Sequence, residues 1–472
     1  MSTLRLTVGW LAAAVAGRII SGDPEQIVGN VVTDSRSLQA GDFFVALRGP
    51  RFDGHAFVDE ALARGATGAV VEAGWAGTAR RAGEASREGV IVEVGDTTIA
   101  LQGLAHAVRE AADTKVVAIT GSAGKTTTKD TIAEFLAASY RVVKNKGNLN
   151  NHIGLPLSLM QLRDKPDVAV MELGMNHAGE ISTLVAIADP DVRVWINVGD
   201  AHLGFFASPD AIADAKAEIL EGAEPHDLLV CTADDPRVRA RTAQFAGRTV
   251  TFGETDGASV RATAIEDRGI DGMRARVTTP QGERVVETPL LGRGNLANVL
   301  AATAVALEFG IPLDTIVERA AALRPSDRRG AVLRLRGGVT LVDDSYNSSP
   351  AALRRALDVI AKESRAARRV AVLGEMLELG AHSSEMHRES GRVAASAGLG
   401  ALFAVGGSPA RELAEAAVEA GMNTADVRYF ESSDAAAPAI AAAIRAGDVV
   451  LVKGSRGTRT DLIADRIAEE FA

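Results

Sequence analysis

The chain has 472 residues, which is enough for about three domains of ordinary size. Its formal net charge of −10 argues against a general nucleic-acid binder, which needs a basic surface. With 47% hydrophobic and 24% charged residues it has the composition of a folded globular protein, and its single cysteine, Cys231, excludes an internal disulfide and a cysteine-based zinc site.

Residues 1–112 are predicted to form a small α/β unit. The segment 6–17, LTVGWLAAAVAG, resembles a weak secretory signal, but it also fits a first amphipathic helix capped by Thr7. We favour the helix, because a secreted protein would not meet the ATP that a later motif implies, and we expect a cytoplasmic protein. No apolar run reaches the ~18–20 residues of a membrane span, so no membrane insertion is expected. Strands are predicted over 43–47, 68–72 and 89–94, and helices over 57–64 and 98–112.

Residues 113–324 are predicted to form a second, central unit. It begins with a strand over 115–120, a glycine-rich turn and a helix that ends near residue 139. Further strands are predicted over 167–172, 193–198 and 227–231, and they alternate with helical stretches. This alternation indicates a parallel sheet with helices on both faces. Residues 258–289 show short strands with polar alternation, which predict an antiparallel insertion, and one helical stretch over 295–323 closes the unit.

Residues 325–472 are predicted to form a third unit after a linker at 324–326. Alanine-rich helices alternate with strands over 339–343, 369–373, 402–405 and 449–453, a Rossmann-like pattern. The predicted fold is therefore α/β with three domains. A central P-loop domain of the ATPase kind, built on a parallel sheet, is flanked by a small N-terminal α/β domain and a C-terminal Rossmann-like domain.

The strongest motif is GSAGKTTT at 121–128, directly after the strand 115–120. Glycines there let backbone N–H groups turn toward phosphate oxygens, and the start of the next helix adds its dipole. Lys125 would reach the β- and γ-phosphates of ATP, and Thr126 would help to hold Mg²⁺. The spacing is shorter than the common form, and a glycine-rich turn with a chance Lys-Thr pair is the alternative. Because strand, loop and helix stand in the required order, we expect an ATP site made of Gly121, Ser122, Ala123, Gly124, Lys125, Thr126 and Thr127.

Lysine is used sparingly in this chain. Only nine of the 51 basic residues are lysines, so arginine is the usual choice wherever any cation would serve. Lys125, Lys216 and Lys453 are therefore candidates for sites that need a compact ammonium group able to lose its proton.

Two further candidates follow strands of the central unit. Glu172 ends the strand 167–172, and His202 follows the strand 193–198, so both lie just past carboxyl ends, where α/β sheets bind ligands. Near a phosphate loop they could hold a second Mg²⁺ or position a phosphoryl group. For either residue alone, a helix cap or a buried hydrogen bond is the alternative. Lys216, within IADAKAEIL, by itself fits an ordinary surface lysine on a helix.

Polar residues at other element ends add nucleotide candidates. Asn295 and Asn298 open a predicted helix and, at i and i+3, share one face. They could bind an adenine edge or a ribose, or simply cap the helix. In the third unit, DDSYN at 343–347 and VKGS at 452–455 stand at strand ends.

Together these motifs resemble the Mur ligases, a family of ATP-dependent amide-forming enzymes of peptidoglycan precursor synthesis, over all three units. The first unit carries TDSRSLQAGDFFVALRGPRFDGHAF, which is similar to the family's uridine-nucleotide-binding region. The second carries TGSAGKTTTK, GNLNNHIGLP, MELGMNHAGEI, AHLGFF and AKAEI in the family's order. The third carries VDDSYNSSPAALRRAL, GEMLELG and VLVKGSRG, which resemble the branch that adds D-alanyl-D-alanine.

The resemblance implies roles for individual residues. Lys125 and Thr126 match the positions for the ATP phosphates and the first Mg²⁺, Glu172 and His202 match the second Mg²⁺, and Lys216 matches a carbamoylated lysine able to bind metal. The catalytic set is thus Lys125, Glu172, His202 and Lys216, and the metal set is Thr126, Glu172, His202 and Lys216. On the nucleotide, Asn295 and Asn298 match adenine-side positions, Asp344 a ribose-side position, and Arg328 or Arg329 the arginine of the hinge. Ser35, Arg36, Asp53 and His55 fall within the motif for the uridine-nucleotide substrate.

The sequence departs from the family's usual pattern at four places. Ala123 stands where asparagine is usual and Gly294 where histidine is usual. HLGFF lacks the glutamate common after HL, and SSP replaces ANP. These changes affect base contacts and ligand geometry and leave the phosphate and metal residues intact.

The implied activity is ATP-dependent ligation of D-alanyl-D-alanine to UDP-N-acetylmuramoyl-tripeptide through an acyl phosphate. ATP and two Mg²⁺ ions would be required, and the enzyme would act as a monomer. The first unit would bind the uridine nucleotide, the second ATP, and the third the amine substrate, and the third unit would close over the nucleotide about residues 324–329. A relative that adds diaminopimelate or lysine is the nearest alternative, and DDSYN argues against it. A folate-polyglutamate ligase and a P-loop kinase without ligase activity are further alternatives. Whether the tripeptide carries diaminopimelate or lysine is left open by the sequence.

Overall fold

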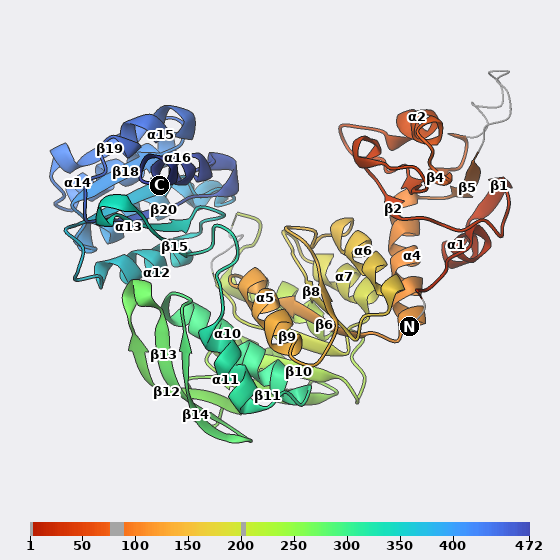
Figure 1. Ribbon diagram of the computed structural model, residues 1–472, viewed down its shortest axis with the longest axis horizontal. Coiled ribbons are helices and arrows are strands. Elements are labelled where there is room, and N and C mark those ends of the chain that lie inside the picture. Colours follow the sequence, from red (N-terminus) through yellow and green to blue (C-terminus); the bar gives the residue numbers. More distant parts are fainter. Residues whose placement is uncertain (1–2, 76–88, 200–203) are drawn as a thin grey trace.

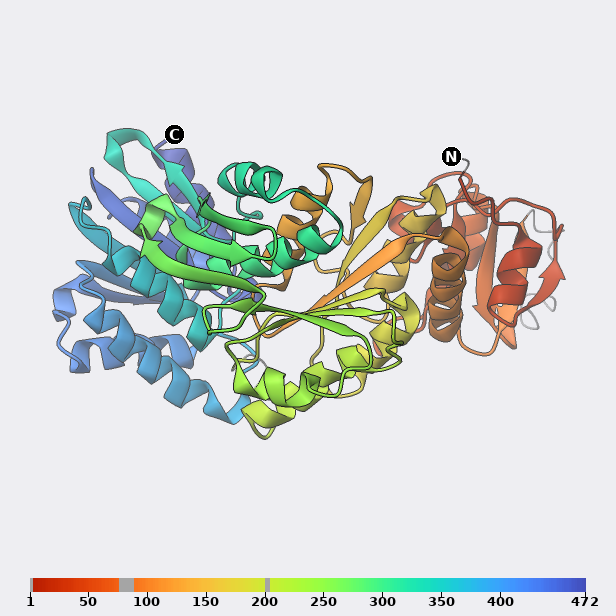
Figure 2. The same cartoon turned by 90° about the horizontal axis from the view of Figure 1, so that it is seen from below.

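The computed structural model describes residues 3–75, 89–199 and 204–472. The described chain forms three sheets that follow one another along the molecule, with the largest in the middle (Figures 1 and 2). We call the segments that carry them the N-terminal unit (3–112), the central unit (115–321) and the C-terminal unit (331–472). The predicted three-part α/β fold is confirmed.

The N-terminal unit is a five-stranded sheet in the order β1-β5-β4-β3-β2. Strands β2 to β5 pair in parallel, and β1 pairs with β5 antiparallel. The predicted helical interpretation of 6–17 is confirmed, because α1 forms and the Thr7 side chain accepts a hydrogen bond from the Trp10 N–H at its start. The elements are α1 Val8–Ala14, β1 Arg18–Ser21, β2 Val31–Val32, β3 Phe43–Val45, α2 Val58–Ala63, β4 Gly68–Glu72, β5 Val90–Val94 and α4 Thr97–Ala112.

The central unit is a nine-stranded sheet in the order β14-β13-β12-β11-β10-β9-β6-β8-β7. Its strands are β6 Lys115–Thr120, β7 Val142–Lys144, β8 Val168–Glu172, β9 Val192–Trp195, β10 Leu228–Thr232, β11 Arg248–Gly253, β12 Val260–Asp267, β13 Met273–Thr279 and β14 Gly282–Thr288. Its helices are α5 Lys125–Leu136, α6 Gly154–Leu159, α7 Glu180–Ala188, α8 Pro209–Ala217, α9 Pro236–Thr242, α10 Gly292–Glu308 and α11 Leu313–Ala321.

Two expectations for the central unit are corrected. The segment 258–289 is antiparallel from β12 to β14, but β12 pairs in parallel with β11, so the segment extends the main sheet and is not a separate insertion. The stretch 295–323 is two helices, α10 and α11, and not one. Gly310, at a φ of +76°, and Pro312 separate them, because glycine tolerates the left-handed turn and proline cannot continue the first helix.

The C-terminal unit is a six-stranded sheet in the order β15-β16-β20-β17-β18-β19, parallel except for β15. Its strands are β15 Ala331–Arg334, β16 Thr340–Asp344, β17 Arg368–Gly374, β18 Ala401–Val405, β19 Val427–Phe430 and β20 Asp448–Lys453. Its helices are α12 Pro350–Ala361, α13 Ser383–Ser396, α14 Ser408–Glu419, α15 Ser433–Ala441 and α16 Asp461–Glu470. The edge strands β15 and β19 were not predicted from the sequence.

Helices pack on both faces of the parallel parts of the two larger sheets, whereas β13 and β14 leave one face exposed. In β6, Val116 and Ala118 belong to one buried cluster while Val117 and Ile119 belong to another, as expected when side chains alternate along a strand. The first of these clusters continues into the N-terminal unit through α4, so the two units share a core. In the described part of the chain, no helix is both long enough and apolar enough to span a membrane.

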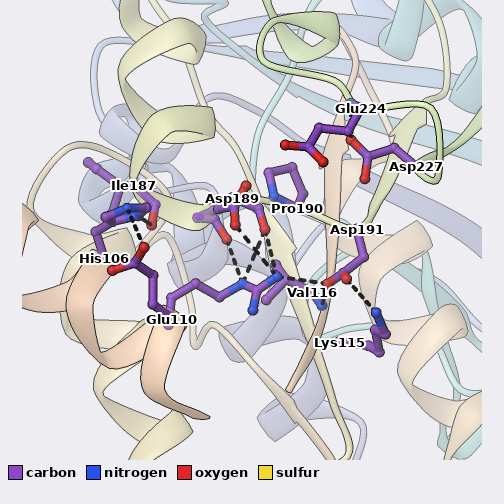
Figure 3. Close-up of polar contacts among 12 residues, drawn as sticks. His106, Glu110, Lys115, Val116, Ile187, Asp189, Pro190, Asp191, Glu224 and Asp227 are labelled. Atoms are coloured by element: carbon purple, nitrogen blue, oxygen red, sulfur yellow. Dashed lines mark hydrogen bonds and ion pairs between the residues drawn. The ribbon is translucent and has the colours of Figure 1, made fainter. Parts of the chain in front are cut away.

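A polar cluster fastens α4 to the central sheet. Asp191 lies directly before β9, and its carboxylate accepts hydrogen bonds from Arg109 (2.8 Å), the Lys115 ammonium (2.7 Å) and the Val116 N–H (2.8 Å). Figure 3 shows the Asp191 carboxylate close to Lys115 and Val116. Arg109 also donates to the Asp189 carbonyl (2.8 Å), so this helix of the N-terminal unit is held by ionic contacts as well as by the shared core.

A second, buried ion pair lies nearby. Arg193 in β9 is 1% exposed and donates to Asp227 Oδ2 (2.7 Å) and to the Pro190 carbonyl (2.6 Å). Asp227 also accepts a hydrogen bond from the Glu224 N–H (2.9 Å). Figure 3 shows Pro190, Glu224 and Asp227 near one another. Because both side chains are buried away from water, the positive charge of Arg193 and the negative charge of Asp227 stabilise each other.

Replacing Asp227 by alanine should lower the free energy of unfolding by about 3–5 kcal/mol, because it leaves the buried Arg193 charge without its partner. Urea denaturation measures the loss. The matched control is Asp214→Ala, which removes an ion pair of equal length (2.7 Å) whose carboxylate side chain is 70% exposed, and it should cost about 1 kcal/mol or less. Equal losses for the two variants would contradict the structural role of the buried pair.

Candidate active site

A cavity of about 1520 Å³ lies between the central and C-terminal units. Its walls are the loops at the carboxyl ends of β6, β8, β9 and β10, the start of α10, and the loops that follow β16, β17 and β20. Parallel strands end on one edge of a sheet, so two such edges face each other across this space. The sequence motifs thus converge on one site from both units.

The loop between β6 and α5 has the shape of a phosphate cradle. Gly124 has a φ of +88°, and a side chain there would lie 2.5 Å from Asn298 Oδ1. A side chain on Gly121 would lie 2.3 Å from Ile196. Glycine is therefore favoured at both positions, because Asn298 and Ile196 come too close to leave room for a side chain. Lys125 starts α5 and donates from Nζ to the Gly121 carbonyl (2.8 Å), and burial lowers the pKa of its ammonium while the Glu172 carboxylate opposes that shift.

Asn197 supports this loop and was not identified from the sequence. β9 ends at Trp195, earlier than predicted, so Asn197 lies in the following loop. Its Oδ1 accepts from the N–H groups of Ser122 and Ala123 (3.0 Å each), and its Nδ2 donates to the Ala123 carbonyl (2.8 Å). The contact joins two segments far apart in the chain, so no local sequence signal points to it.

Glu172 is held rigidly at the end of β8. Its carboxylate accepts from Thr126 Oγ1 and from Asn150 Nδ2, both at 2.8 Å, and its side chain is buried. Lys129 Nζ lies 3.8 Å from Oε2 of Glu172, and Asn145 exchanges hydrogen bonds with the Glu172 backbone (3.1 Å each). Lys129, Asn145 and Asn150 were not singled out from the sequence, although Asn145 and Asn150 lie at or beside the quoted GNLNNHIGLP motif.

Lys216 is not the surface lysine that its local sequence suggests. It lies on α8 with 1% exposure, and its ammonium forms no hydrogen bond with the described residues. Burial lowers the pKa of Lys216 well below its ordinary value, and the positive charge of Lys125 lowers it further, whereas Glu218 opposes the shift. An amine in such surroundings is favoured in its neutral form. Lys216 is not among the residues that line the cavity.

His202 lies outside the described residues, so its place relative to Glu172 is not stated. Within the described ranges, no three histidine, cysteine, aspartate or glutamate side chains gather closely enough to hold a metal ion. The described oxygen donors of the predicted metal set are Thr126 and Glu172, which hydrogen-bond each other.

The nucleotide candidates lie on both walls of the cavity. Asn298 Nδ2 donates to Asn295 Oδ1 (3.0 Å), and Asn295 Nδ2 donates to the Leu291 carbonyl (2.9 Å). Leu291 precedes α10 and no side chain caps this helix, so the alternative role of the asparagines as caps is not supported. On the other wall, Asp344 accepts from Lys453 Nζ at 2.6 Å.

The two candidate arginines of the hinge point in different directions. Arg328 has a φ of +56° and donates to both carboxylate oxygens of Asp465 (3.0 Å each), away from the cavity lining. Arg329 lines the cavity, with its guanidinium carbon 3.9 Å from the centre of the Tyr346 ring. Of the two, Arg329 is the one that a ligand in the cavity would meet.

The four candidates of the N-terminal unit do not line this cavity. Ser35 and Arg36 form a turn capped by Asp34, and the exposed Arg36 is paired with that carboxylate at 2.7 Å. His55 is buried, its Nδ1 lies 2.6 Å from Asp53 Oδ1, and its Nε2 accepts from the Glu72 N–H (2.8 Å). Both ring nitrogens are therefore used inside the unit, and His55 shapes the loop that carries Asp53.

Comparison with known proteins gives a consistent result over the whole chain. Three family models match: "Mur ligase family, catalytic domain" over residues 28–116, "Mur ligase middle domain" over 119–306, and "Mur ligase, glutamate ligase domain" over 328–456. The UDP-N-acetylmuramoyl-tripeptide–D-alanyl-D-alanine ligase of Bacillus subtilis is 31% identical over 467 residues, covering 99% of both chains. The enzyme of the same name from Escherichia coli is 36% identical over 377 residues, covering 80% of this chain and 81% of its own.

Solved structures agree with these relatives. A crystal structure of MurF from Acinetobacter baumannii superposes with a TM-score of 0.87 at 32% identity and covers 99% of this chain and 100% of its own. MurF ligase from Thermotoga maritima, solved in complex with ADP, gives a TM-score of 0.81 at 29% identity and covers 94% of this chain and 98% of its own.

Proposed function

The chain belongs to the Mur ligase family, and from that premise we propose that it is the ATP-dependent ligase that joins D-alanyl-D-alanine to UDP-N-acetylmuramoyl-tripeptide. The observation that carries this proposal is one cavity lined by the phosphate loop, by Glu172, and by Asn295, Asn298, Arg329 and Asp344 from both units. Similarity to ligases of this name, over 99% of both chains for the Bacillus subtilis enzyme, supports the choice of substrates, and the need for ATP supports a cytoplasmic location.

The reaction must overcome the low reactivity of a carboxylate toward an amine. One oxygen of the tripeptide carboxylate attacks the γ-phosphorus of ATP, the bond to the β-phosphate oxygen breaks, and ADP leaves. The neutral amine of the dipeptide then attacks the acyl carbon, phosphate leaves with the bonding electrons, and the nitrogen loses a proton. Lys125, at the phosphate cradle, would offset the charge of the γ-phosphate as the carboxylate approaches.

The residues present fit Mg²⁺ as far as they are described. Thr126 and Glu172 offer a hydroxyl and a carboxylate in contact with each other, and Mg²⁺ usually adds substrate phosphate oxygens and water to one or two such protein ligands. Bound there, Mg²⁺ would supply positive charge against the triphosphate. We assign the first ion to Thr126 and a second to Glu172 and His202.

Carbamoylation of Lys216 is part of the proposal. The reaction with CO₂ requires the neutral amine, and the burial of Lys216 together with the nearby charge of Lys125 favours that form. The carbamate would give this position a carboxylate-like head able to bind metal.

The remaining binding roles follow the two walls of the cavity. We assign the adenine side to Asn295 and Asn298, the ribose side to Asp344, and the hinge contact to Arg329 in place of Arg328. The uridine nucleotide is assigned to the N-terminal unit near Ser35, Arg36, Asp53 and His55. We further propose that the C-terminal unit moves about residues 324–329 during turnover and that the enzyme acts as a monomer.

The choice between the two arginines is testable. Arg329→Ala should raise the KM for ATP roughly tenfold or more, because it removes a charged contact, whereas Arg328→Ala should affect stability more than the KM for ATP. Initial-rate kinetics of both variants measure this. An unchanged KM for ATP in Arg329→Ala would return the role to Arg328.

Phosphate release is the direct test of the proposed function. Phosphate should form from ATP only when both UDP-N-acetylmuramoyl-tripeptide and D-alanyl-D-alanine are present. A panel of tripeptides and amines then separates the diaminopimelate and lysine forms of the substrate. Steady ATP hydrolysis without the dipeptide would favour a kinase, and release with free diaminopimelate or lysine as the amine would favour the related ligase.

A further inference from the structure

The lysine and arginine side chains that line the cavity differ in whether they already form hydrogen bonds or ion pairs. Among the described lining residues, the lysines and arginines are Lys125, Arg237, Arg329, Arg355, Lys453 and Arg456. Lys125 and Lys453 donate hydrogen bonds, Arg237 lies 3.8 Å from Asp235, and Arg329 stacks on Tyr346. The guanidiniums of Arg355 and Arg456 form no hydrogen bond or ion pair with the described residues. Because arginine cannot lose its charge, each is a candidate contact for an anion that enters the cavity.

Arg355 belongs to the nucleotide end of the cavity. Its Cδ and Nε lie 3.5 Å from the point that a side chain on Gly294 would occupy, at the start of α10 beside Asn295. The negative charge of Asp344, the ribose-side candidate, also acts on it. An anion at Arg355 would therefore sit among the groups assigned to ATP.

Arg456 lies at a different place, in the turn after β20. Its guanidinium carbon is 5.8 Å from the centre of the Tyr346 ring, the same ring on which Arg329 stacks at 3.9 Å. Arg456 is therefore a neighbour of the hinge arginine, whose charge reaches Lys125, and it remains exposed to the cavity. Arg456 and the phosphate cradle therefore line the same cavity.

The wall around Arg456 combines apolar and hydroxyl groups. The Leu377 side chain is 44% exposed and lies against Gly457, where an added side chain would be 2.7 Å from its Cδ1. The Leu377 N–H donates to Ser455 Oγ (2.9 Å), which fixes the loop after β17 against the loop after β20. Ser348, also in the lining, has a buried hydroxyl without a hydrogen-bond partner among the described residues.

We propose that Arg456 binds the C-terminal carboxylate of D-alanyl-D-alanine and that Leu377 packs against the methyl groups of the dipeptide. The inference rests on the proposed function and names how its amine substrate is held. The amine must be neutral to attack, so an ammonium group cannot anchor the reactive dipeptide. The carboxylate is then its one charged group, and a planar guanidinium matches it with two parallel hydrogen bonds.

The test compares D-alanyl-D-alanine with D-alanyl-D-alaninamide, which lacks the negative charge but keeps the amine and both methyl groups. The wild-type enzyme should prefer the acid by roughly ten- to a hundredfold in kcat/KM, the range expected for a charged hydrogen bond. Arg456→Ala should lower kcat/KM for the acid by that factor and leave the amide unchanged, so that the preference disappears. Arg456→Lys should retain part of the preference for the acid, because lysine keeps the positive charge but cannot form two parallel hydrogen bonds with a carboxylate.

Arg355→Ala is the matched control, because it removes the other uncommitted guanidinium of the cavity and should leave the ratio of acid to amide as in the wild type. The Arg456 guanidinium forms no hydrogen bond with the residues that the structure describes, so its removal should leave the fold intact, and an unchanged Kd for ATP verifies this.

Each contrary outcome has a distinct meaning. An equal rate for acid and amide in the wild type, or an unaltered preference in Arg456→Ala, would overturn the inference while ligation itself stands. A rise in KM for the UDP-substrate alone would assign Arg456 to a carboxylate of the tripeptide and likewise overturn it. Failure of the wild type to ligate either dipeptide would instead refute the proposed function.

Discussion

Lys125→Met should reduce kcat/KM for ligation by roughly 10³-fold or more, because it removes the one ammonium group of the phosphate cradle. The Nζ of Lys125 lies at the start of α5 and donates to the Gly121 carbonyl, in a loop where a side chain on Gly121 or Gly124 would approach Ile196 or Asn298 too closely. The Kd for ATP should rise as well, since the lysine contacts the ground state and the transferring phosphoryl group alike.

The matched control for this variant is Lys115→Met. Lys115 is the first residue of β6, at the end of the strand opposite to the phosphate loop. Its side chain is 63% exposed and pairs with Asp191 away from the cavity. Its replacement should leave kcat/KM within about twofold of the wild type and cost about 1 kcal/mol of stability or less. A Lys125→Met enzyme that ligates at the rate of this control would show that the loop does not serve ATP.

Lys216→Ala should abolish turnover, and a short carboxylic acid added to the assay should restore part of it. The reason is that the proposed carbamate supplies a carboxylate at a buried position, which an alanine side chain cannot replace. Lys216→Arg should be equally inactive, because guanidinium cannot be carbamoylated. Steady-state rates with and without the acid give the comparison.

A second readout for Lys216 does not depend on activity. Wild-type enzyme equilibrated with ¹³C-bicarbonate should show a carbamate signal by ¹³C NMR that is missing in Lys216→Ala. Raising the pH should strengthen the signal until the amine is fully neutral, since only the neutral amine reacts with CO₂. Full activity of Lys216→Arg, or no carbamate signal in active wild-type enzyme, would contradict the carbamate.

Local patterns in the sequence predicted the elements that surround the site. β4 and β6 have the predicted bounds, and α4 and β5 differ from them by one residue, because their apolar runs end at glycine, aspartate or threonine positions that stop an element. The loop 121–128 was recognised because its glycines, lysine and threonine form a contiguous motif. These are features that neighbouring residues determine together.

The features that were missed depend on residues distant in the chain. β15 and β19 are four-residue edge strands with no fully buried residue, so they lack the apolar run that marks an inner strand. Asn197 and Lys129 form hydrogen bonds with loops that are distant from them in the sequence. Asn197 contacts the loop that begins at residue 121, and Lys129 contacts the Asn145 carbonyl. The choice between Arg328 and Arg329 depended on the left-handed backbone of Arg328, which sends neighbouring side chains in different directions.

The burial of Lys216 is the instructive case for the site. Its helix has polar and apolar residues in mixed order, and the local sequence favoured an exposed side chain. Lysine scarcity and the family resemblance pointed the other way, and the structure shows the side chain buried. Residue choice over the whole chain therefore carried information that the local pattern did not.

The central claim is that ATP activates a carboxylate by transferring its γ-phosphoryl group to it, and an isotope experiment tests this most directly. UDP-N-acetylmuramoyl-tripeptide labelled with ¹⁸O in the reacting carboxylate is ligated to D-alanyl-D-alanine in unlabelled water, and the released phosphate is analysed by mass spectrometry. The account predicts that each phosphate carries one ¹⁸O atom from the carboxylate. Phosphate without the label, released at the rate of ligation, would contradict it.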